Sequence, residues 1–335
     1  MKVAILAPIA WRTPPRKYGP WELVTSNITE GLVKKGIDVT LFATGDSITR
    51  GKLEYICPAG YEEDKSIEPK VAECIHISYL MEHAQNFDII HNNFDFLPLT
   101  YSRLISTPMV TTIHGFSSSK IIPVYKKYND INHYVSISYA DRSTQLEYIA
   151  NIYNGIDPDS FSFNNEQGNY LLYFGRIHHD KGTHEAIEIA LKAKMKLIIA
   201  GYIQDKPYYD QQVKPYIDGE QIVYTGNADS KQRNRLLGNA YALLHPINFN
   251  EPFGLSVAES MFCGTPVVAF KKGSMEELIQ DRKTGFLVKN KEEAVETISQ
   301  VKEIDRSYCR QWAETKFSIH KIIDDYINVY IKVLN

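Results

Sequence analysis

The sequence predicts an α/β protein with two domains, each built on a parallel sheet. The chain has 335 residues, which is longer than a single hydrophobic core usually grows. Short apolar strand patterns alternate with helical patterns, and this alternation begins near residue 3 and again at residue 170. Between the two series lies a polar connector with Asn154-Gly155, Asp157-Pro158 and the run 164–169. We therefore expect domains at 1–156 and 168–318.

The first half opens with a strand, a helix and a second strand. Residues 3–10 form an apolar run interrupted by Pro8, which we interpret as a buried strand and not as a signal peptide. A loop of prolines, arginines and aromatics follows at 11–21, at the end of a strand where open α/β sheets bind ligands. The remaining elements expected here are a helix at 23–33, strands at 39–43, 89–91, 109–113 and 134–137, and a helix at 71–84.

The second half repeats this order. We expect a strand at 170–175, a helix at 185–193 and a strand at 196–201. Further on, a run without breakers at 255–262 predicts a helix, and 267–270 predicts a buried strand. The last segment, 319–335, has apolar residues at helical spacing, and we expect it to pack back on the N-terminal domain.

Composition excludes several classes of protein. The formal net charge is -3 and no long basic run occurs, which argues against nucleic acid and acidic membrane surfaces as partners. No apolar stretch approaches the length of a membrane span. The four cysteines show no C-x-x-C spacing, so we expect reduced thiols, no zinc site and a cytoplasmic location.

Two carboxylates flank a predicted helix start. Pro252 and Gly254 break regular structure, so Glu251 is expected in a loop and Glu259 about one turn inside the following helix. A helix N-terminus offers free amide donors and a positive dipole end, which attract phosphate. The segment therefore indicates a ligand with both hydroxyl and phosphate groups.

Arg176 and Lys181 come directly after the strand at 170–175. A guanidinium fork and a compact ammonium at this place suit a diphosphate, although two solvated surface charges would show the same spacing. The motifs that accompany this pair decide between these readings, and they occur in a fixed order: the loop at Gly19, 112–115, 135–138, 154–157, 174–182, 200–201 and 251–259.

This ordered set resembles glycosyltransferase family 4, which has the GT-B fold. The resemblance covers nearly the whole chain, and the Glu251-Pro252-Phe253-Gly254-Leu255 segment, with a second glutamate eight residues after the first, is its most specific part. It implies two Rossmann-like, doubly wound domains that face a central cleft. The N-terminal domain would bind the acceptor and the C-terminal domain the nucleotide-sugar donor.

The resemblance also implies roles for single residues. Glu251 would hydrogen-bond the donor sugar, and Glu259 would accept the ribose hydroxyls. Arg176 and Lys181 would neutralise the leaving diphosphate. Backbone amides of Phe253, Gly254 and Leu255 would face the sugar and the distal phosphate, while His114 and the loop at Gly19 would come from the N-terminal domain. One departure is Gly19-Pro20, where many relatives have Gly-Gly, because proline removes a backbone donor.

The implied function is transfer of a hexose from a nucleotide diphosphate sugar to a hydroxyl acceptor with retention of configuration. We expect a UDP-sugar rather than GDP-mannose, and neither metal nor other cofactor. The alternatives are a nucleotide-sugar epimerase on the same scaffold and an inactive sugar-nucleotide-binding subunit. A glycosidase is disfavoured, because Glu251 and Glu259 need not face one bond, and so is a dinucleotide oxidoreductase, because no G-x-G-x-x-G follows either opening strand.

Several other polar residues have simpler readings. The Asp157-Pro158-Asp159 sequence matches the D-x-D pattern of metal-dependent transferases, but we interpret it as turn chemistry. His91, His178, His179 and His245 are expected to be structural or to lie at the rim of a site. His91 and Asn93 follow a strand, where they could also contact an acceptor.

Overall fold

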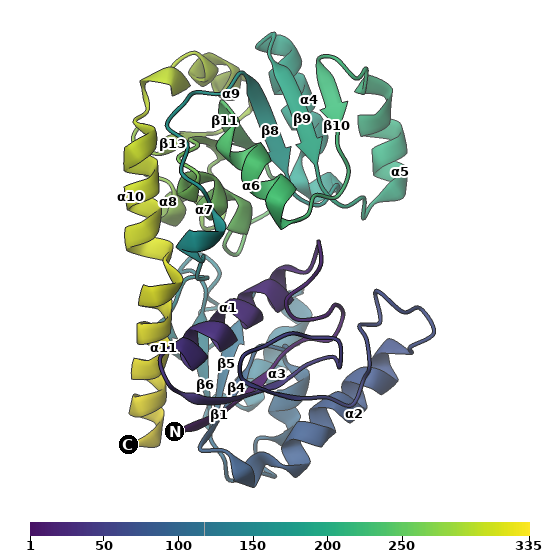
Figure 1. The fold of residues 1–335 in the computed structure, drawn as a ribbon, viewed down its shortest axis with the longest axis vertical. Helices are drawn as coiled ribbons and strands as arrows, with labels where there is room; N and C mark the ends of the chain where they lie inside the picture. The colour runs from purple at the N-terminus through teal and green to yellow at the C-terminus, as the bar shows by residue number, and fades with distance from the viewer. Residues whose placement is uncertain (117) are drawn as a thin grey trace. The chain divides into compact units, whose positions relative to one another are not determined.

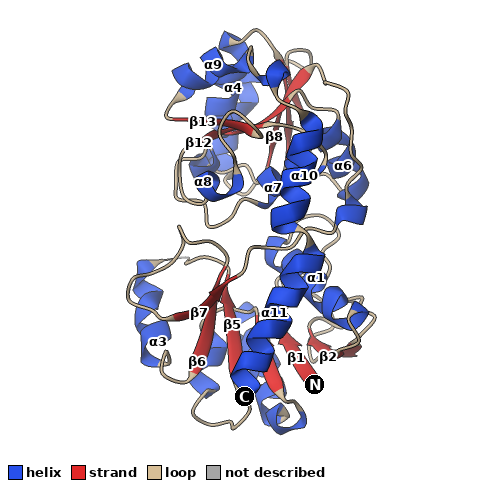
Figure 2. Ribbon diagram, turned by 90° about the vertical axis from the view of Figure 1, so that its left-hand side faces the viewer, coloured by secondary structure: helices blue, strands red, loops and turns tan. Residues whose placement is uncertain are grey.

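A computed structural model describes residues 1–116 and 118–335, and these residues divide into two compact units (Figure 1). The first unit holds residues 1–155 and 319–335, and the second holds residues 156–318. Each unit is a parallel sheet with helices against it (Figure 2). The predicted α/β class with two parallel-sheet domains is therefore confirmed.

The sheet of the first unit has seven strands in the described residues, in the order β3-β2-β1-β4-β5-β6-β7. The strands are β1 (Lys2–Leu6), β2 (Asp38–Phe42), β3 (Lys52–Glu54), β4 (Ile89–Asn92), β5 (Met109–Ile113), β6 (Asn132–Ser136) and β7 (Tyr148–Asn151). The helices are α1 (Pro20–Lys34), α2 (Pro69–Glu82), α3 (Ile122–Lys127) and α11 (Ile319–Leu334). Every residue of β4 and β5 is buried, as expected for parallel strands covered on both faces.

The C-terminal helix α11 belongs to this first unit and packs against α1. Gly31 of α1 permits the contact, because a Cβ there would lie 2.4 Å from Ile323 of α11. Two tyrosines of α11 also reach the sheet: the Tyr330 hydroxyl lies 2.6 Å from Nδ1 of His91, and the Tyr326 hydroxyl lies 2.9 Å from Oγ1 of Thr112. His91 is fully buried and its Nε2 lies 2.8 Å from the same Thr112 oxygen. His91 is thus a structural residue that ties α11 to the sheet.

The second unit has a six-stranded sheet over its described length, in the order β10-β9-β8-β11-β12-β13. Its strands are β8 (Tyr170–Phe174), β9 (Lys196–Ala200), β10 (Ile222–Tyr224), β11 (Ala242–His245), β12 (Val267–Phe270) and β13 (Gly285–Val288). Its helices are α4 (Thr183–Lys192), α5 (Lys206–Tyr208), α6 (Ser230–Gly238), α7 (Leu255–Phe262), α8 (Met275–Leu278), α9 (Lys291–Ile298) and α10 (Arg306–Phe317).

Strand order reverses direction between β8 and β11 in this sheet, and between β1 and β4 in the first. Such reversal points open a crevice at the carboxyl ends of the two strands, where doubly wound sheets bind ligands. The loops after β8 and β11 carry most of the site residues predicted from the sequence. The topology therefore places them at the edge of the sheet where a ligand is expected.

Most predicted elements are present, with ends that differ by a few residues. The helix at 255–262 and the strand at 267–270 have the predicted bounds, whereas the first helix begins at Pro20 and not at Leu23. The sequence did not reveal β3, β7, β10, β11 and β13, which have only three or four residues each. Strand β7 ends at Asn151, three residues before the Asn154-Gly155 motif of the predicted connector.

No helix in residues 1–116 and 118–335 is both long enough and apolar enough to cross a membrane. The four cysteines are free thiols, and only Cys74 is exposed. In the Asp157-Pro158-Asp159 sequence, the Asp157 side chain accepts a hydrogen bond from the backbone N–H of Asp159 at 3.1 Å. This is the turn geometry expected from the sequence.

Candidate active site

Hydrogen bonds and a close backbone contact hold the loop after β11 against the loop after β8. The N–H of Asn248 donates to the carbonyl of Asp180 at 2.7 Å, and the Asn248 side chain donates to Glu185 at 2.6 Å. Gly182 has a φ of 69°, and a Cβ on it would lie 1.9 Å from the carbonyl oxygen of Pro246. Only glycine fits this position, and it lets the two loops that carry charged side chains meet.

Lys181 and Glu251 form an ion pair between these two loops. Lys181 Nζ lies 2.5 Å from Glu251 Oε2, and the two side chains are only 17% and 11% exposed. The ammonium also lies 4.6 Å from the centre of the Phe249 ring. His245, the last residue of β11, places Nε2 3.6 Å from the same carboxylate oxygen. A carboxylate and a cation are therefore held at the carboxyl ends of β8 and β11.

The charges around Glu251 keep it ionised. Burial alone would raise the pKa of Glu251, but Lys181 and then His245 outweigh burial and lower that pKa to about 2. Burial also lowers the pKa of His245, although Glu251 opposes this effect. At neutral pH the cluster thus contains a fixed carboxylate that can accept hydrogen bonds from hydroxyl groups.

The backbone of Glu251 is held by the turn at Gly273 and Ser274. A Cβ on Gly273, whose φ is 58°, would lie 2.3 Å from both the nitrogen and the oxygen of Glu251. The Ser274 N–H donates to the Glu251 carbonyl at 2.9 Å, and the Ser274 hydroxyl donates to the Phe253 carbonyl at 2.6 Å. The segment before α7 is consequently rigid without any ligand.

Gly254 is the residue that turns this segment into α7. Its φ of 94° is in the left-handed region, and Leu255 begins the helix. The first turn of a helix leaves amide donors without partners inside the helix, and these can bind an anion. Phe253 is 2% exposed and its ring packs edge-on against Phe317 at 5.7 Å, so its side chain belongs to the core. The Phe253 side chain therefore takes no part in the predicted contact.

Arg176 and Lys181 both lie on the loop after β8, but their side chains have different partners. Its guanidinium donates to Gln204 Oε1 at 2.6 Å and to Asp180 Oδ2 at 3.0 Å. The arginine side chain is 21% exposed. The structure therefore brings Lys181 to Glu251 and holds Arg176 with Asp180 of the same loop and Gln204 of the segment after β9.

Glu259 lies inside α7 and is paired with a residue that the sequence did not single out. Arg233 of α6 places Nη1 3.0 Å from Glu259 Oε1, and the two side chains are 17% and 3% exposed. Burial raises the pKa of Glu259, and the charge of Arg233 opposes this rise. Glu259 is thus a buried carboxylate, and most of its surface is covered without a ligand.

In the first unit, a second polar group lies at the ends of β4 and β5. His114 follows β5, is 8% exposed, and places Nε2 3.0 Å from Oδ1 of Asn93, which follows β4. Among the described residues, His114 Nδ1 and Asn93 Nδ2 have no hydrogen-bond partner. Trp21 stacks on the imidazole at a ring distance of 5.9 Å. Burial lowers the pKa of His114 to about 4, so the ring is neutral at pH 7.

Gly19 precedes α1 beside a buried carboxylate. Its φ is 147°, and a Cβ there would lie 2.7 Å from Pro15 and 3.1 Å from Glu22. Glu22 is 3% exposed, and its Oε1 accepts the backbone N–H of Trp11 at 3.2 Å. Burial raises the pKa of Glu22 to about 7. The loop at Gly19, which was predicted to approach a phosphate, therefore contacts the carboxyl group of Glu22, which can be protonated near neutral pH.

Reasoning from the sequence did not single out Arg233 or Glu22. It also did not predict that His245 lies beside Glu251. His245 ends an apolar strand, a position that signals a site in an open sheet. Arg233 lies in a polar helix turn, and Glu22 lies in the first turn of α1, where a carboxylate is common. Neither position differs from an ordinary surface pattern, and only the fold shows that both are buried.

Comparison with known families agrees with this arrangement. The sequence-family model described as "Glycosyltransferase Family 4" matches residues 22–160. The family model described as "Glycosyl transferases group 1" matches residues 157–317. The two models together cover both units of the chain.

Relatives and solved structures support the same family. An uncharacterized glycosyltransferase of Methanocaldococcus jannaschii is 22% identical, with 98% of each chain covered. A glycogen synthase of Mycobacterium tuberculosis is 30% identical over 42% of this chain and 36% of its own length.

Among solved structures, a sucrose-phosphate synthase from Thermosynechococcus elongatus has a TM-score of 0.78 at 18% identity, covering 99% of this chain and 98% of its own. The Anabaena protein HepE, solved with UDP and glucose, has a TM-score of 0.76 at 19% identity, covering 99% and 100%. These likenesses show the two-domain GT-B fold. The two family models, which together match residues 22–317, show that the chain belongs to the family-4-type glycosyltransferases.

Proposed function

We propose that this glycosyltransferase moves a hexose from a nucleotide diphosphate sugar to a hydroxyl acceptor, retains the anomeric configuration and needs no metal ion for the transfer. The observation that carries the proposal is the buried Lys181–Glu251 pair beside the start of α7, at the point where the strand order reverses. A cation and amide donors suit a diphosphate, and an ionised carboxylate suits sugar hydroxyls. One ligand class, a sugar joined to a diphosphate, combines both requirements.

In the proposed reaction, the bond between the anomeric carbon and the leaving phosphate oxygen breaks and negative charge develops on the diphosphate. Lys181, Arg176 and the first amides of α7 stabilise this charge, which is the role that a metal ion has in other transferases. The acceptor oxygen forms its bond to the anomeric carbon on the same face. The proton of the acceptor passes to the leaving phosphate oxygen, which balances the step without a protein base.

The carboxylates have separate roles in this scheme. Glu251, ionised at neutral pH, accepts hydrogen bonds from sugar hydroxyls. Glu259 accepts the ribose hydroxyls through the carboxylate that Arg233 holds in place. His114, neutral at pH 7, hydrogen-bonds the sugar and does not act as an acid. This division is consistent with a donor that has two groups of hydroxyls on either side of a diphosphate.

We favour a UDP-sugar over GDP-mannose as the donor. The support is indirect: the similar Anabaena protein was solved with UDP-glucose. A thermal-shift series with UDP, GDP and ADP and their sugars tests this choice, because a ligand that binds only the folded chain raises its melting temperature. A larger shift with GDP-mannose than with UDP-sugars would contradict it.

Transfer is tested with Glu251→Gln, which keeps the shape of the side chain and removes its charge. We expect kcat to fall by about 10²–10³-fold, since a hydrogen-bond acceptor of the reacting sugar is lost. Glu259→Gln should chiefly weaken donor binding, by roughly 10-fold or more. Glu166→Gln is the control, because Glu166 is an exposed residue of the same unit. Full activity in both site variants would contradict the proposal.

Two alternatives give different results in the same assays. An epimerase would convert the donor with no acceptor present. A binding subunit without activity would show a thermal shift but neither transfer nor donor hydrolysis. Activity that persists in EDTA tests the proposed metal independence.

A further inference from the structure

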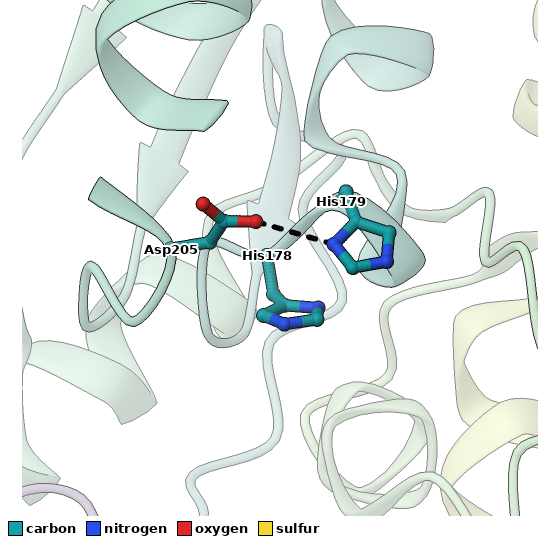
Figure 3. Close-up of side chains that lie close together, drawn as sticks. All are labelled: His178, His179 and Asp205. Carbon is teal, nitrogen blue, oxygen red and sulfur yellow. Dashed lines mark hydrogen bonds and ion pairs between the residues drawn. The ribbon is translucent and has the colours of Figure 1, made fainter. Parts of the chain in front are cut away.

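Three side chains with metal-ligand chemistry lie together at the ends of β8 and β9 (Figure 3). His178 and His179 are in the loop after β8, and Asp205 follows β9. One possible ligand atom from each residue lies within 4.8 Å of the other two. The proposed transfer reaction uses none of these three side chains.

We propose that His178, His179 and Asp205 bind one divalent transition-metal ion, with Zn²⁺ as the best fit. Two imidazoles and one carboxylate are ligands that zinc accepts, and they do not suit Mg²⁺ or Ca²⁺, which take oxygen ligands. Three protein ligands would leave a fourth position for water. The resulting site is an open one on the surface of the second unit.

The two segments that carry the ligands are held together by their backbones. Ile177 and Ile203 form a parallel bridge, and the Ile177 N–H donates to the Tyr202 carbonyl at 2.7 Å. The Asp205 N–H donates to the Ile177 carbonyl at 3.1 Å. These bonds are immediately next to His178 and Asp205. The chain therefore positions two of the ligands before any ion arrives.

The closest pair already has the separation that a bound ion requires. His179 Nδ1 lies 3.2 Å from Asp205 Oδ2. Tetrahedral zinc with ligand bonds of about 2.0–2.1 Å places neighbouring ligand atoms roughly 3.3 Å apart. An ion can therefore replace the shared proton between these atoms with little movement of either side chain.

The remaining groups around the site are arranged like the outer shell of a metal centre. Asp180 Oδ1 lies 2.7 Å from His178 Nδ1, and the Asp180 backbone N–H lies 3.4 Å from the same nitrogen, so Asp180 contacts Nδ1 and leaves Nε2 to bind an ion. Asp205 Oδ1 accepts the Tyr208 N–H at 3.1 Å, which orients the carboxylate. The two imidazole rings lie with their centres 4.2 Å apart. Asp180 and Tyr208 thus hold the side chains of His178 and Asp205 in place.

The test uses the whole chain after treatment with EDTA. Titration with Co²⁺ alone, followed by its visible absorption, and displacement of Co²⁺ by Zn²⁺ measure affinity and stoichiometry. We expect one ion per chain and a loss of affinity of at least 10-fold in both His179→Ala and Asp205→Asn. His83→Ala is the matched control, because His83 is an exposed histidine of the first unit and should not change Co²⁺ binding.

His179 has a side chain that is 68% exposed, so its substitution should leave folding intact, and a thermal unfolding curve without metal verifies this. Unchanged Co²⁺ affinity in His179→Ala, or equal losses in His83→Ala, would overturn the proposal. Because the readout is binding of the metal alone, its result does not depend on whether the chain transfers a hexose.

Discussion

Replacing Lys181 by methionine should lower the free energy of unfolding of the second unit by much more than the loss of a surface ion pair would. The variant leaves the Glu251 carboxylate buried, with His245 beside it as a group that still lowers its pKa. Breaking a buried pair by removing one partner is costly, since the remaining charge has lost both water and its counter-ion. The folded chain would then have to hold an uncompensated charge at neutral pH.

The pKa of Glu251 gives the magnitude. A lowering from its ordinary value of 4.5 to about 2 corresponds to about 3 kcal/mol, at 1.36 kcal/mol per pKa unit. Since the folded-state pKa is the lower one, this stabilisation is present above pH 4.5 and is lost as the pH falls to about 2. Because this lowering is the net result of burial, Lys181 and His245, we expect Lys181→Met to lower the free energy of unfolding at pH 7 by an amount on the order of 3 kcal/mol.

A double-mutant cycle isolates the pair. Lys181→Met, Glu251→Gln and the double variant are unfolded in urea and followed by the fluorescence of Trp312, with Trp11 and Trp21 replaced by phenylalanine so that only the second unit reports. The double variant should regain much of the stability, because no charge is left unpaired. It should still be inactive.

The control cycle uses Lys291 and Glu188 of the same unit, whose Nζ–Oε2 distance is also 2.5 Å but whose side chains are 29% and 40% exposed. Exposed pairs contribute about 0–1 kcal/mol. If the Lys181–Glu251 coupling energy were no larger than that of the control pair, the assignment of the lowered pKa to this contact would be wrong.

Two further predictions concern stability. Glu22→Gln should stabilise the first unit by up to about 3 kcal/mol at pH 8.5 relative to pH 5, because the raised pKa of about 7 costs the wild type stability as the pH rises from 4.5 through 7; equal effects in urea unfolding at both pH values would contradict this. Gly182→Ala should cost several kcal/mol and weaken nucleotide binding, whereas Gly219→Ala, with a φ of 81° but open space around it, should cost only about 1 kcal/mol. Similar melting temperatures in the two variants would refute the close approach of Gly182 to Pro246.

Local patterns predicted the fold because the strands of both sheets are short apolar runs with breakers on either side. Helix α7 has its predicted bounds, since Gly254 and the Gly264-Thr265-Pro266 stop are encoded within a few residues of its ends. The strands that were missed are β3, β7, β10 and β13, which are the edge strands of the two sheets, and the central strand β11. All five have only three or four residues. Position in the sheet, which depends on distant strands, decides such cases.

The predicted site residues show a different limit. Motif order gave Glu251, Lys181 and Glu259 as candidates, but the sequence could not show that Lys181 contacts Glu251 across 70 residues. Nor could it show that Glu259 pairs with Arg233 of another helix. The Lys181–Glu251 contact depends on close approaches at Gly182 and Gly273, where the backbone of one loop packs against that of another. The Glu259–Arg233 contact depends on the packing of α7 against α6. Their ligand-binding roles stay predictions until the variants are measured.

The two units differ in the charge that they hold at the carboxyl ends of their central strands. In the second unit, the carboxyl ends of β8 and β11 hold ionised Glu251 and its cation, which suits a donor with a diphosphate and sugar hydroxyls. In the first unit, the ends of β4 and β5 hold neutral His114 and Asn93, each with an unpaired polar atom within the described residues. Unpaired neutral groups gain most from a neutral hydroxyl partner, because neither side has to give up the hydration of a charge. From this contrast in electrostatics we expect charge neutralisation in the second unit and hydroxyl recognition in the first.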